Sequence, residues 1–293
     1  MKSLEERQNL MGENVYTFTA KPDADAEIKA SLLLVHGLGE HCRRYDHVIQ
    51  AMTDAGIAVT AFDHIGHGRT SGKRGVYRYA TAWQLIRHFQ GKLLASEPSL
   101  PFFLYGHSLG GALVLTYAQR FPADVRGVVA SSPGLGTVPP YPNWLTAAVG
   151  FLGRTFPKLT TPNFLPPENL YHGAGEDKIY TKDPLVHGVL SLSLAHDLIT
   201  LGRDMVERSD PFPVPLLLLQ GGADRCVDPE MTARFAKKTG NEKVEFVAYP
   251  DGYHELHNEP FLKEDVIHRM IDWIVGKVTK RSEERRVGKE CRS

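Results

Sequence analysis

The segment 106–110, Gly-His-Ser-Leu-Gly, carries the clearest chemical signal in the chain. It follows the apolar run 101–105 and leads into the apolar run 111–115, which predicts a strand, a sharp turn and a helix. The glycines allow a turn that is too tight for side chains at those positions. Ser108 stands at the apex of this turn, where its hydroxyl would project from the carboxyl edge of a sheet. We therefore predict that Ser108 is a catalytic nucleophile.

A serine hydroxyl becomes a good nucleophile only when a base takes its proton and an acid orients that base. Two later loops offer these groups in the expected order along the chain. Asp224 follows a run of four leucines and is the predicted acid, and His254 follows the next apolar run and is the predicted base. Asp228 is a reserve acid, although its place before Pro229 favours a role as the cap of a helix.

Acyl transfer also needs backbone amides that stabilise the oxyanion. One predicted donor is the N–H of Leu109, directly after the nucleophile. The other is the N–H of Leu38, in the segment 36–41 (His-Gly-Leu-Gly-Glu-His), which follows an expected strand and whose glycines allow a close approach of the backbone. These two amides are the predicted oxyanion hole.

The elements that must position these loops follow an alternating pattern of short apolar runs and helical segments. This pattern predicts an α/β-hydrolase fold, with a mostly parallel central sheet flanked by helices. We expect strands at 15–19, 31–35, 57–62, 102–105, 127–130, 216–219 and 244–247, the first of them an antiparallel edge strand. We expect helices at about 45–54, 83–96, 109–121, 229–239 and 261–277.

The interval 134–210 interrupts this alternation, because it is rich in proline, glycine and aromatic residues. An excursion of this length is unlikely to be structureless inside a compact domain. We interpret it as a cap, or lid, inserted between strands 6 and 7 above the strand ends. The hydrolase core then comprises residues 1–133 and 211–280. The charged, aperiodic segment 281–293 is predicted to be a non-native tail.

Composition limits the possible partners. Lys plus Arg and Asp plus Glu are balanced at 34 each, so no excess charge points to nucleic acid. Three cysteines make no disulfide framework, and the first residues form no secretory signal or membrane span, so we expect a cytoplasmic protein. The thirteen histidines include no H-E-x-x-H pattern, and we expect no metal and no cofactor. The sequence leaves the oligomeric state open.

Taken together, these loops resemble those of the serine α/β-hydrolases, and within them the monoacylglycerol lipase and lysophospholipase group of serine aminopeptidase S33-like hydrolases. The resemblance covers about residues 12–278. It is carried by the segments 36–41 with Arg44 and Tyr45, 63–68, 106–111, 223–225, and Tyr253-His254 with His257.

The resemblance implies the same catalytic set, Ser108, Asp224 and His254. It also implies that Glu40, Arg44, Tyr180 and His257 contact the glycerol moiety, and that the cap forms an acyl-chain tunnel and rests transiently on a membrane surface. From the residues alone, Glu40 and Arg44 could equally form an ion pair within their loop, and Tyr180 could simply pack inside the cap.

The predicted function is hydrolysis of a small lipid ester, most simply a monoacylglycerol or a lysophospholipid, through an acyl-enzyme on Ser108. Two alternatives use the same fold. An acyltransferase would pass the acyl group to an alcohol instead of water, and a non-catalytic binding protein would not react with serine-directed reagents.

Overall fold

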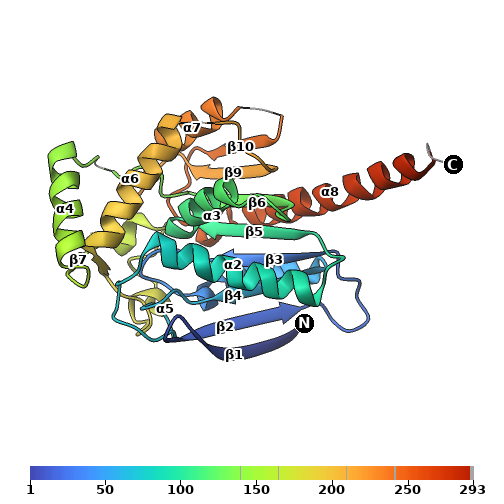
Figure 1. The fold of residues 1–293 in the computed structure, drawn as a ribbon, viewed down its shortest axis with the longest axis horizontal. Coiled ribbons are helices and arrows are strands. Elements are labelled where there is room, and N and C mark those ends of the chain that lie inside the picture. Colours follow the sequence, from blue (N-terminus) through green and yellow to red (C-terminus); the bar gives the residue numbers. More distant parts are fainter. Residues whose placement is uncertain (139, 164, 209, 241, 291–293) are drawn as a thin grey trace.

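The computed structural model is built around an eight-stranded sheet with the order β1-β2-β4-β3-β5-β6-β9-β10 (Figure 1). It describes residues 1–138, 140–163, 165–208, 210–240 and 242–290, without the side chains of 208 and 279–290. The first two strands are antiparallel and the remaining six pair in parallel. The strands are β1 (Lys2–Leu10), β2 (Glu13–Lys21), β3 (Ala30–Val35), β4 (Ile57–Phe62), β5 (Phe102–His107), β6 (Gly127–Ser131), β9 (Leu216–Gly221) and β10 (Val244–Tyr249). The predicted mostly parallel sheet is thus confirmed.

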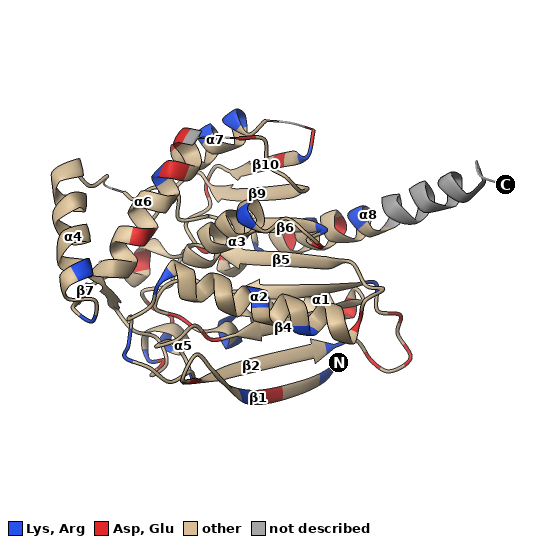
Figure 2. Cartoon of the chain, viewed as in Figure 1, with Lys and Arg blue, Asp and Glu red and all other residues tan. Residues whose placement is uncertain are grey.

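Helices cover both faces of this sheet. α1 and α8 pack on one face, and α2, α3 and α7 pack on the other (Figures 1 and 2). Their bounds are α1 (Asp46–Asp54), α2 (Tyr79–Ser96), α3 (Leu109–Arg120), α7 (Pro229–Lys238) and α8 (Lys263–Glu290), with short 3-10 turns at η1 (Cys42–Tyr45) and η3 (Leu256–Asn258). Five helices were predicted at these places.

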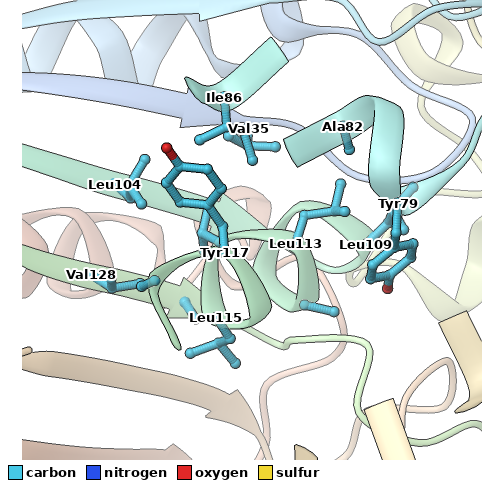
Figure 3. Close-up of a cluster of buried hydrophobic side chains, with 14 of the residues drawn as sticks. Val35, Tyr79, Ala82, Ile86, Leu104, Leu109, Leu113, Leu115, Tyr117 and Val128 are labelled. Atoms are coloured by element: carbon cyan, nitrogen blue, oxygen red, sulfur yellow. The ribbon is translucent and has the colours of Figure 1, made fainter. Parts of the chain in front are cut away.

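The two faces bury separate apolar clusters because neighbouring residues of a strand point to opposite sides. In β3, Leu33 and Val35 join the cluster under α2 and α3, whereas Leu32 and Leu34 join the cluster under α1 and α8. Figure 3 shows the first cluster, in which strand residues such as Leu104 meet side chains of α2 and α3. Burial on both faces explains why the central strands read as unbroken apolar runs.

The amino-terminal strand β1 was not predicted, and β2 is therefore not the edge strand that we expected. β1 carries mostly exposed, charged residues, so it shows no apolar alternation. It pairs with β2 across a two-residue turn in which Met11 and Gly12 both have positive φ, 55° and 81°. Two such residues favour a tight hairpin, so β1 is held by backbone pairing rather than by burial.

The chain between β6 and β9 forms an insertion outside the main sheet. Its long helices, α4 (Asn143–Thr155) and α6 (Leu192–Arg208), pack together at one end of the molecule (Figure 1). The other elements are β7 (Thr160–Pro162), η2 (Pro167–Asn169), α5 (Lys178–Thr181) and β8 (Val189–Ser191). β7 and β8 form a separate two-stranded sheet. The exact cap and core boundaries stay predictions.

The last helix is longer than expected, since α8 ends at Glu290 rather than near residue 277. Lys, Arg and Glu are good helix formers, and the segment contains no proline, which explains the continuation. Residues 291–293 of the predicted tail lie outside the described residues, and its non-native origin stays a prediction. Among the described helices, none combines the length and the apolar character that a membrane span requires.

Candidate active site

Ser108 lies between β5 and α3 in a strained backbone conformation, with φ 54° and ψ −119°. The two flanking glycines make this turn possible. A Cβ atom on Gly106 would lie 2.3 Å from the Gly110 carbonyl oxygen, and one on Gly110 would lie 1.9 Å from the Val35 oxygen. Because those neighbours are backbone atoms, no side chain fits at either position. The predicted sharp turn is present, with Ser108 at its apex.

The structure brings the three predicted side chains into one hydrogen-bonded series. His254 Nε2 lies 2.9 Å from Ser108 Oγ, and His254 Nδ1 lies 2.8 Å from Asp224 Oδ2. Asp224 follows β9 and His254 follows β10, while Ser108 follows β5. The carboxyl ends of these parallel strands meet at one edge of the sheet, which is why such distant loops converge. This geometry suits transfer of a proton from the serine to the imidazole.

The Asp224 carboxylate is fixed by several donors. Oδ1 accepts the backbone N–H groups of Cys226 and Val227 at 2.8 and 3.0 Å, and Oδ2 also accepts Gln220 Nε2 at 3.1 Å. Burial would raise the pKa of Asp224, but the charge and hydrogen bond of His254 and these two amides lower it below its ordinary value. Asp224 therefore remains ionised and holds the imidazole.

Asp228, the reserve acid, has the structural role that its sequence position favoured. Its side chain accepts the Glu230 N–H at 2.9 Å and caps the first turn of α7, with Pro229 as the first helical residue. Among the described residues, the His254 ring bonds to Asp224 and Ser108, not to Asp228. Asp224 is thus the only one of the two candidate acids that contacts the imidazole.

His254 is nearly fully buried, and its environment favours the protonated form. Burial lowers the pKa of His254, but the charge and hydrogen bond of Asp224, followed by the charges of Glu255 and Glu40, raise it by more, so the pKa lies above its ordinary value. The same negative charges stabilise the imidazolium that His254 becomes when it takes the serine proton.

The predicted oxyanion amides lie beside Ser108. A Cβ atom on Gly37 would be 3.3 Å from Ser108 Cβ, so the segment 36–41 approaches the nucleophile closely. Leu109 is the first residue of α3, where a helix leaves its N–H groups free. Within the described part of the chain, neither the Leu38 nor the Leu109 amide donates to another protein group. Both N–H groups are therefore free to donate hydrogen bonds to a developing oxyanion.

A cavity of about 380 Å3 opens beside Ser108 and runs between the insertion and the core. Its walls are mainly apolar and come from both parts, for example Met231 from α7 of the core and Leu145, Val149 and Leu198 from α4 and α6 of the insertion. Ser108 and His254 also line it. A cavity of this shape and polarity suits a hydrocarbon chain whose ester carbonyl lies at the serine.

A second, small recess beside Ser108 is polar. Glu40, Arg44 and Tyr180 line it, as does Glu255, which the sequence analysis did not single out. Arg44 lies 4.5 Å from the Tyr180 ring centroid and makes an ion pair with each carboxylate, at 2.6 Å to Glu40 and 2.7 Å to Glu255. The ion pair between Glu40 and Arg44 is thus present, and their contact with glycerol stays a prediction.

Burial and charge act in opposite directions on the two carboxylates that share Arg44. Burial raises the pKa of Glu40, which exceeds its ordinary value although Arg44 opposes the change. Burial also raises the pKa of Glu255, but the charge and two hydrogen bonds of Arg44 lower this pKa by more, so that it lies below its ordinary value. Glu255 directly follows His254 in sequence, and this position next to the predicted base is the feature from which its place in the site could have been predicted.

The structure places His257, a predicted substrate contact, below the surface of the site, and its contact with glycerol stays a prediction. Its ring is completely buried, stacks on Tyr45 at 4.6 Å between centroids and meets His107 edge-on at 4.9 Å. It lines neither the apolar cavity nor the polar recess. The chain turns inward after His254, through η3, and this turn buries His257 next to His107.

The described residues contain one group with the spacing of metal ligands, Asp224, Cys226 and His254, whose donor atoms lie within 4.8 Å of one another. Two of the three already bond to each other, and burial raises the pKa of the Cys226 thiol, which disfavours the thiolate that metals bind. His36 and His64 instead support the loops: His36 Nε2 accepts the His64 N–H at 3.0 Å.

The fold and the site together define an α/β-hydrolase. The family model described as serine aminopeptidase, S33, matches residues 26–261. The chain belongs to this family.

Similar proteins narrow the class. The chain is 34% identical to monoacylglycerol lipase of Mycolicibacterium smegmatis over 87% of its own length and 90% of the relative's. It is 30% identical to monoglyceride lipase of Rattus norvegicus over 84% and 82% of the two lengths. The crystal structure of Paleococcus ferrophilus monoacylglycerol lipase matches with a TM-score of 0.82 and 33% identity, over 90% and 99% of the chains. These findings confirm the predicted fold, the resemblance and the assignment to the carboxylic ester hydrolases.

Proposed function

We propose that the chain hydrolyses monoacylglycerols to a fatty acid and glycerol, with Ser108 as nucleophile. The observation that carries this proposal is the series Ser108–His254–Asp224 at the junction of an apolar cavity and a polar recess. The names of the similar lipases support the substrate class. The acyl chain would occupy the cavity and the glycerol the recess.

In the first half of the reaction, Ser108 Oγ attacks the ester carbonyl while His254 Nε2 takes its proton. Asp224 stabilises the resulting imidazolium. The carbonyl oxygen becomes an oxyanion, which accepts hydrogen bonds from the Leu38 and Leu109 N–H groups. The tetrahedral intermediate then collapses, the bond to the glycerol oxygen breaks, and His254 gives that oxygen its proton.

In the second half, water repeats the sequence on the acyl-enzyme. His254 takes a proton from the water, the hydroxide oxygen bonds to the acyl carbon, and the bond to Ser108 Oγ breaks. The proton returns to Ser108, and the fatty acid leaves. The sum is one ester and one water converted to one acid and one alcohol, with no cofactor.

The charges of the recess favour a neutral alcohol over a phosphate. Two carboxylates, Glu40 and Glu255, face a single guanidinium, Arg44, and already accept three hydrogen bonds from it. A phosphate there would meet excess negative charge, whereas glycerol hydroxyls can both donate and accept. We therefore favour monoacylglycerols over lysophospholipids, although a phospholipase of Bacillus subtilis is also similar, at 28% identity.

We further propose that the protein is cytoplasmic and that α4 rests on lipid surfaces. Its side chains Trp144 and Phe151 are 72% and 63% exposed. The helix contains one charged residue, Arg154, and Figure 2 shows no acidic residue along it. Because Leu145 and Val149 of α4 line the cavity, a lipid could pass from the surface directly into it. Buried, free Cys42 and Cys226 agree with a reducing compartment.

A substrate panel tests the proposed reaction. Wild type and Ser108→Ala are assayed with monoacylglycerols, lysophospholipids, short nitrophenyl esters and aminoacyl amides, and fluorophosphonate labelling is followed in parallel. We expect monoacylglycerols to give the highest kcat/KM and Ser108→Ala to lose both turnover, by about 10⁴-fold or more, and labelling. Ser131→Ala, which removes a nearby buried hydroxyl, is the matched control.

Each other outcome points to one alternative. New esters formed when glycerol or another alcohol is added would indicate an acyltransferase. Absence of turnover and labelling in folded wild type would indicate a binding protein. Vesicle sedimentation tests the surface of α4, where a Trp144→Ser/Phe151→Ser variant should lose vesicle binding but keep activity on soluble short esters.

A further inference from the structure

We propose that the insertion holds the oxyanion loop, residues 36–41, in its active position, and that Asp183 is a positioning residue for the reaction. The inference rests on the proposed ester hydrolysis and extends it, because it assigns the insertion a second task besides enclosing the acyl chain. Two contacts between the insertion and the loop carry the argument.

The first contact joins the two backbones. The His187 N–H donates to the Gly39 carbonyl oxygen at 2.8 Å. Gly39 has a φ of +75°, and a Cβ atom there would lie 2.3 Å from the His187 carbonyl oxygen and 3.3 Å from Asn163 Nδ2. The insertion thus touches the loop one residue beyond Leu38, and only glycine permits this approach.

The second contact is an ion pair or hydrogen bond between side chains. His41 Nε2 lies 2.8 Å from Asp183 Oδ2, and the two side chains are only 6% and 18% exposed. Asp183 Oδ1 accepts the Leu185 N–H at 2.8 Å, which fixes the carboxylate. The Val186 N–H donates to the Asp183 carbonyl oxygen, so Asp183 also orders the turn that leads to His187.

The core holds the other end of the same loop. Glu40 Oε1 accepts the Gly37 N–H and the Tyr45 hydroxyl, both at 2.6 Å. The Leu38 amide therefore lies between an inner anchor at Gly37 and an outer anchor at Gly39. An oxyanion donor works only if it is held in position before the charge develops. Releasing the outer anchor should leave the Leu38 amide less well placed, although Asp183 itself never touches the substrate.

The chain provides a matched control for a general loss of contact between insertion and core. Asp197 of α6 forms an ion pair with Arg78 at 2.7 Å, and its side chain is 13% exposed. Asp197 resembles Asp183 in its own burial and in joining the insertion to the core, but its partner Arg78 is 49% exposed and lies at α2 rather than at the oxyanion loop. Asp197→Ala therefore measures how much kcat changes when the insertion loses an ion pair to the core that does not involve the oxyanion loop.

The experiment compares Asp183→Ala, Asp183→Asn and Asp197→Ala in the full chain. Each variant is assayed for kcat and KM with a monoacylglycerol, and for inhibition by two analogues of that substrate. Ser108 Oγ adds to the carbonyl of a trifluoromethyl ketone, and the carbonyl oxygen becomes an oxyanion. An ether analogue has no carbonyl and forms no oxyanion. Thermal unfolding confirms that each variant is folded.

We expect Asp183→Ala to lower kcat about 10- to 100-fold with little change in KM. The affinity for the trifluoromethyl ketone should fall by a similar factor, while that for the ether should stay near wild type. Asp183→Asn should recover most of kcat, because its amide can still bond to His41 and to the Leu185 N–H. Asp197→Ala should keep kcat and both affinities.

Three results would overturn the inference. The first is a kcat of Asp183→Ala equal to that of Asp197→Ala, and the second is an equal loss of affinity for the ketone and the ether in Asp183→Ala. The third is a folded Asp183→Asn variant whose kcat stays as low as that of Asp183→Ala. These results are distinct from a failure of the proposed function, which would appear as absence of ester hydrolysis in wild type itself.

Discussion

Arg44 and Glu255 form a two-point ion pair beside the imidazole of the site. Arg44 Nη1 donates to Glu255 Oε1 at 2.8 Å, and Nη2 donates to Oε2 at 2.7 Å. Planar pairs of this kind fix both position and orientation. The pair therefore anchors the residue that follows His254, and it places a negative charge close to the proposed base.

This charge leads to a prediction about pH. The base must be neutral to accept the serine proton, so kcat/KM should fall as the pH drops through the pKa of His254, which Asp224 and Glu255 raise above its ordinary value. Glu255→Gln removes one negative charge, destabilises the imidazolium and should move the acid limb of kcat/KM to lower pH. The exposed Glu230→Gln should leave the limb unchanged. A shift of the Glu255→Gln limb to higher pH would falsify this assignment.

A second prediction separates the two candidate acids. Asp224→Asn should lower kcat about 10³- to 10⁴-fold, because the amide no longer stabilises the imidazolium or selects the correct tautomer of His254. Asp228→Asn should leave both kcat and the melting temperature near wild type, since asparagine caps a helix as well as aspartate does. Steady-state kinetics of the two purified variants suffices, and equal losses would contradict the separation.

A third prediction concerns the glycines of the turn. Gly110→Ala would place a Cβ atom 1.9 Å from the Val35 oxygen, so we expect it to destabilise the fold by about 3 kcal/mol or more or to prevent folding. Gly91→Ala, in α2, meets nothing within 4 Å and should stabilise by about 0.5–1 kcal/mol. Thermal unfolding of both variants checks this pair. Similar melting temperatures would mean that the turn is less crowded than the structure indicates.

A fourth prediction addresses the acyl chain. Ala195 of α6 lines the apolar cavity, so Ala195→Phe should reduce the space for long chains. We expect kcat/KM to fall at least tenfold for long-chain monoacylglycerols and to change little for short nitrophenyl esters. Ala195→Leu should give an intermediate result. If long and short esters lost activity equally, the chain would occupy another path.

The sequence predicted the central strands well, because burial on both faces leaves continuous apolar runs such as that of β9. The strand–turn–helix around Ser108 was also predictable, since only glycine satisfies its crowded positions. β1 was missed because its residues face solvent and its pairing depends on the backbone of a hairpin. A strand whose residues mostly face solvent shows no alternation of apolar and polar residues, so its sequence does not indicate a strand.

Within the site, residues that directly follow strand ends were predictable, and residues placed by tertiary contacts were not. Asp224 and His254 follow β9 and β10, so the parallel sheet alone brings them near Ser108. The place of His257 depends on the turn after His254, and the contact of Asp183 with His41 joins residues 142 positions apart. No local pattern encodes such a pairing.

The unequal exposure of the tryptophans has a practical consequence. The indole of Trp144 is 72% exposed on α4, whereas that of Trp273 is 7% exposed and packs against Phe103. The third indole, of Trp83 in α2, is half-buried and donates to Thr116 Oγ1 at 3.1 Å. Indole emission moves to shorter wavelength when the ring leaves water, so we expect a blue shift on adding vesicles to come mainly from Trp144, the most exposed of the three indoles. The protein therefore carries a built-in optical reporter, and adsorption could be timed in a stopped-flow fluorimeter without attaching any dye.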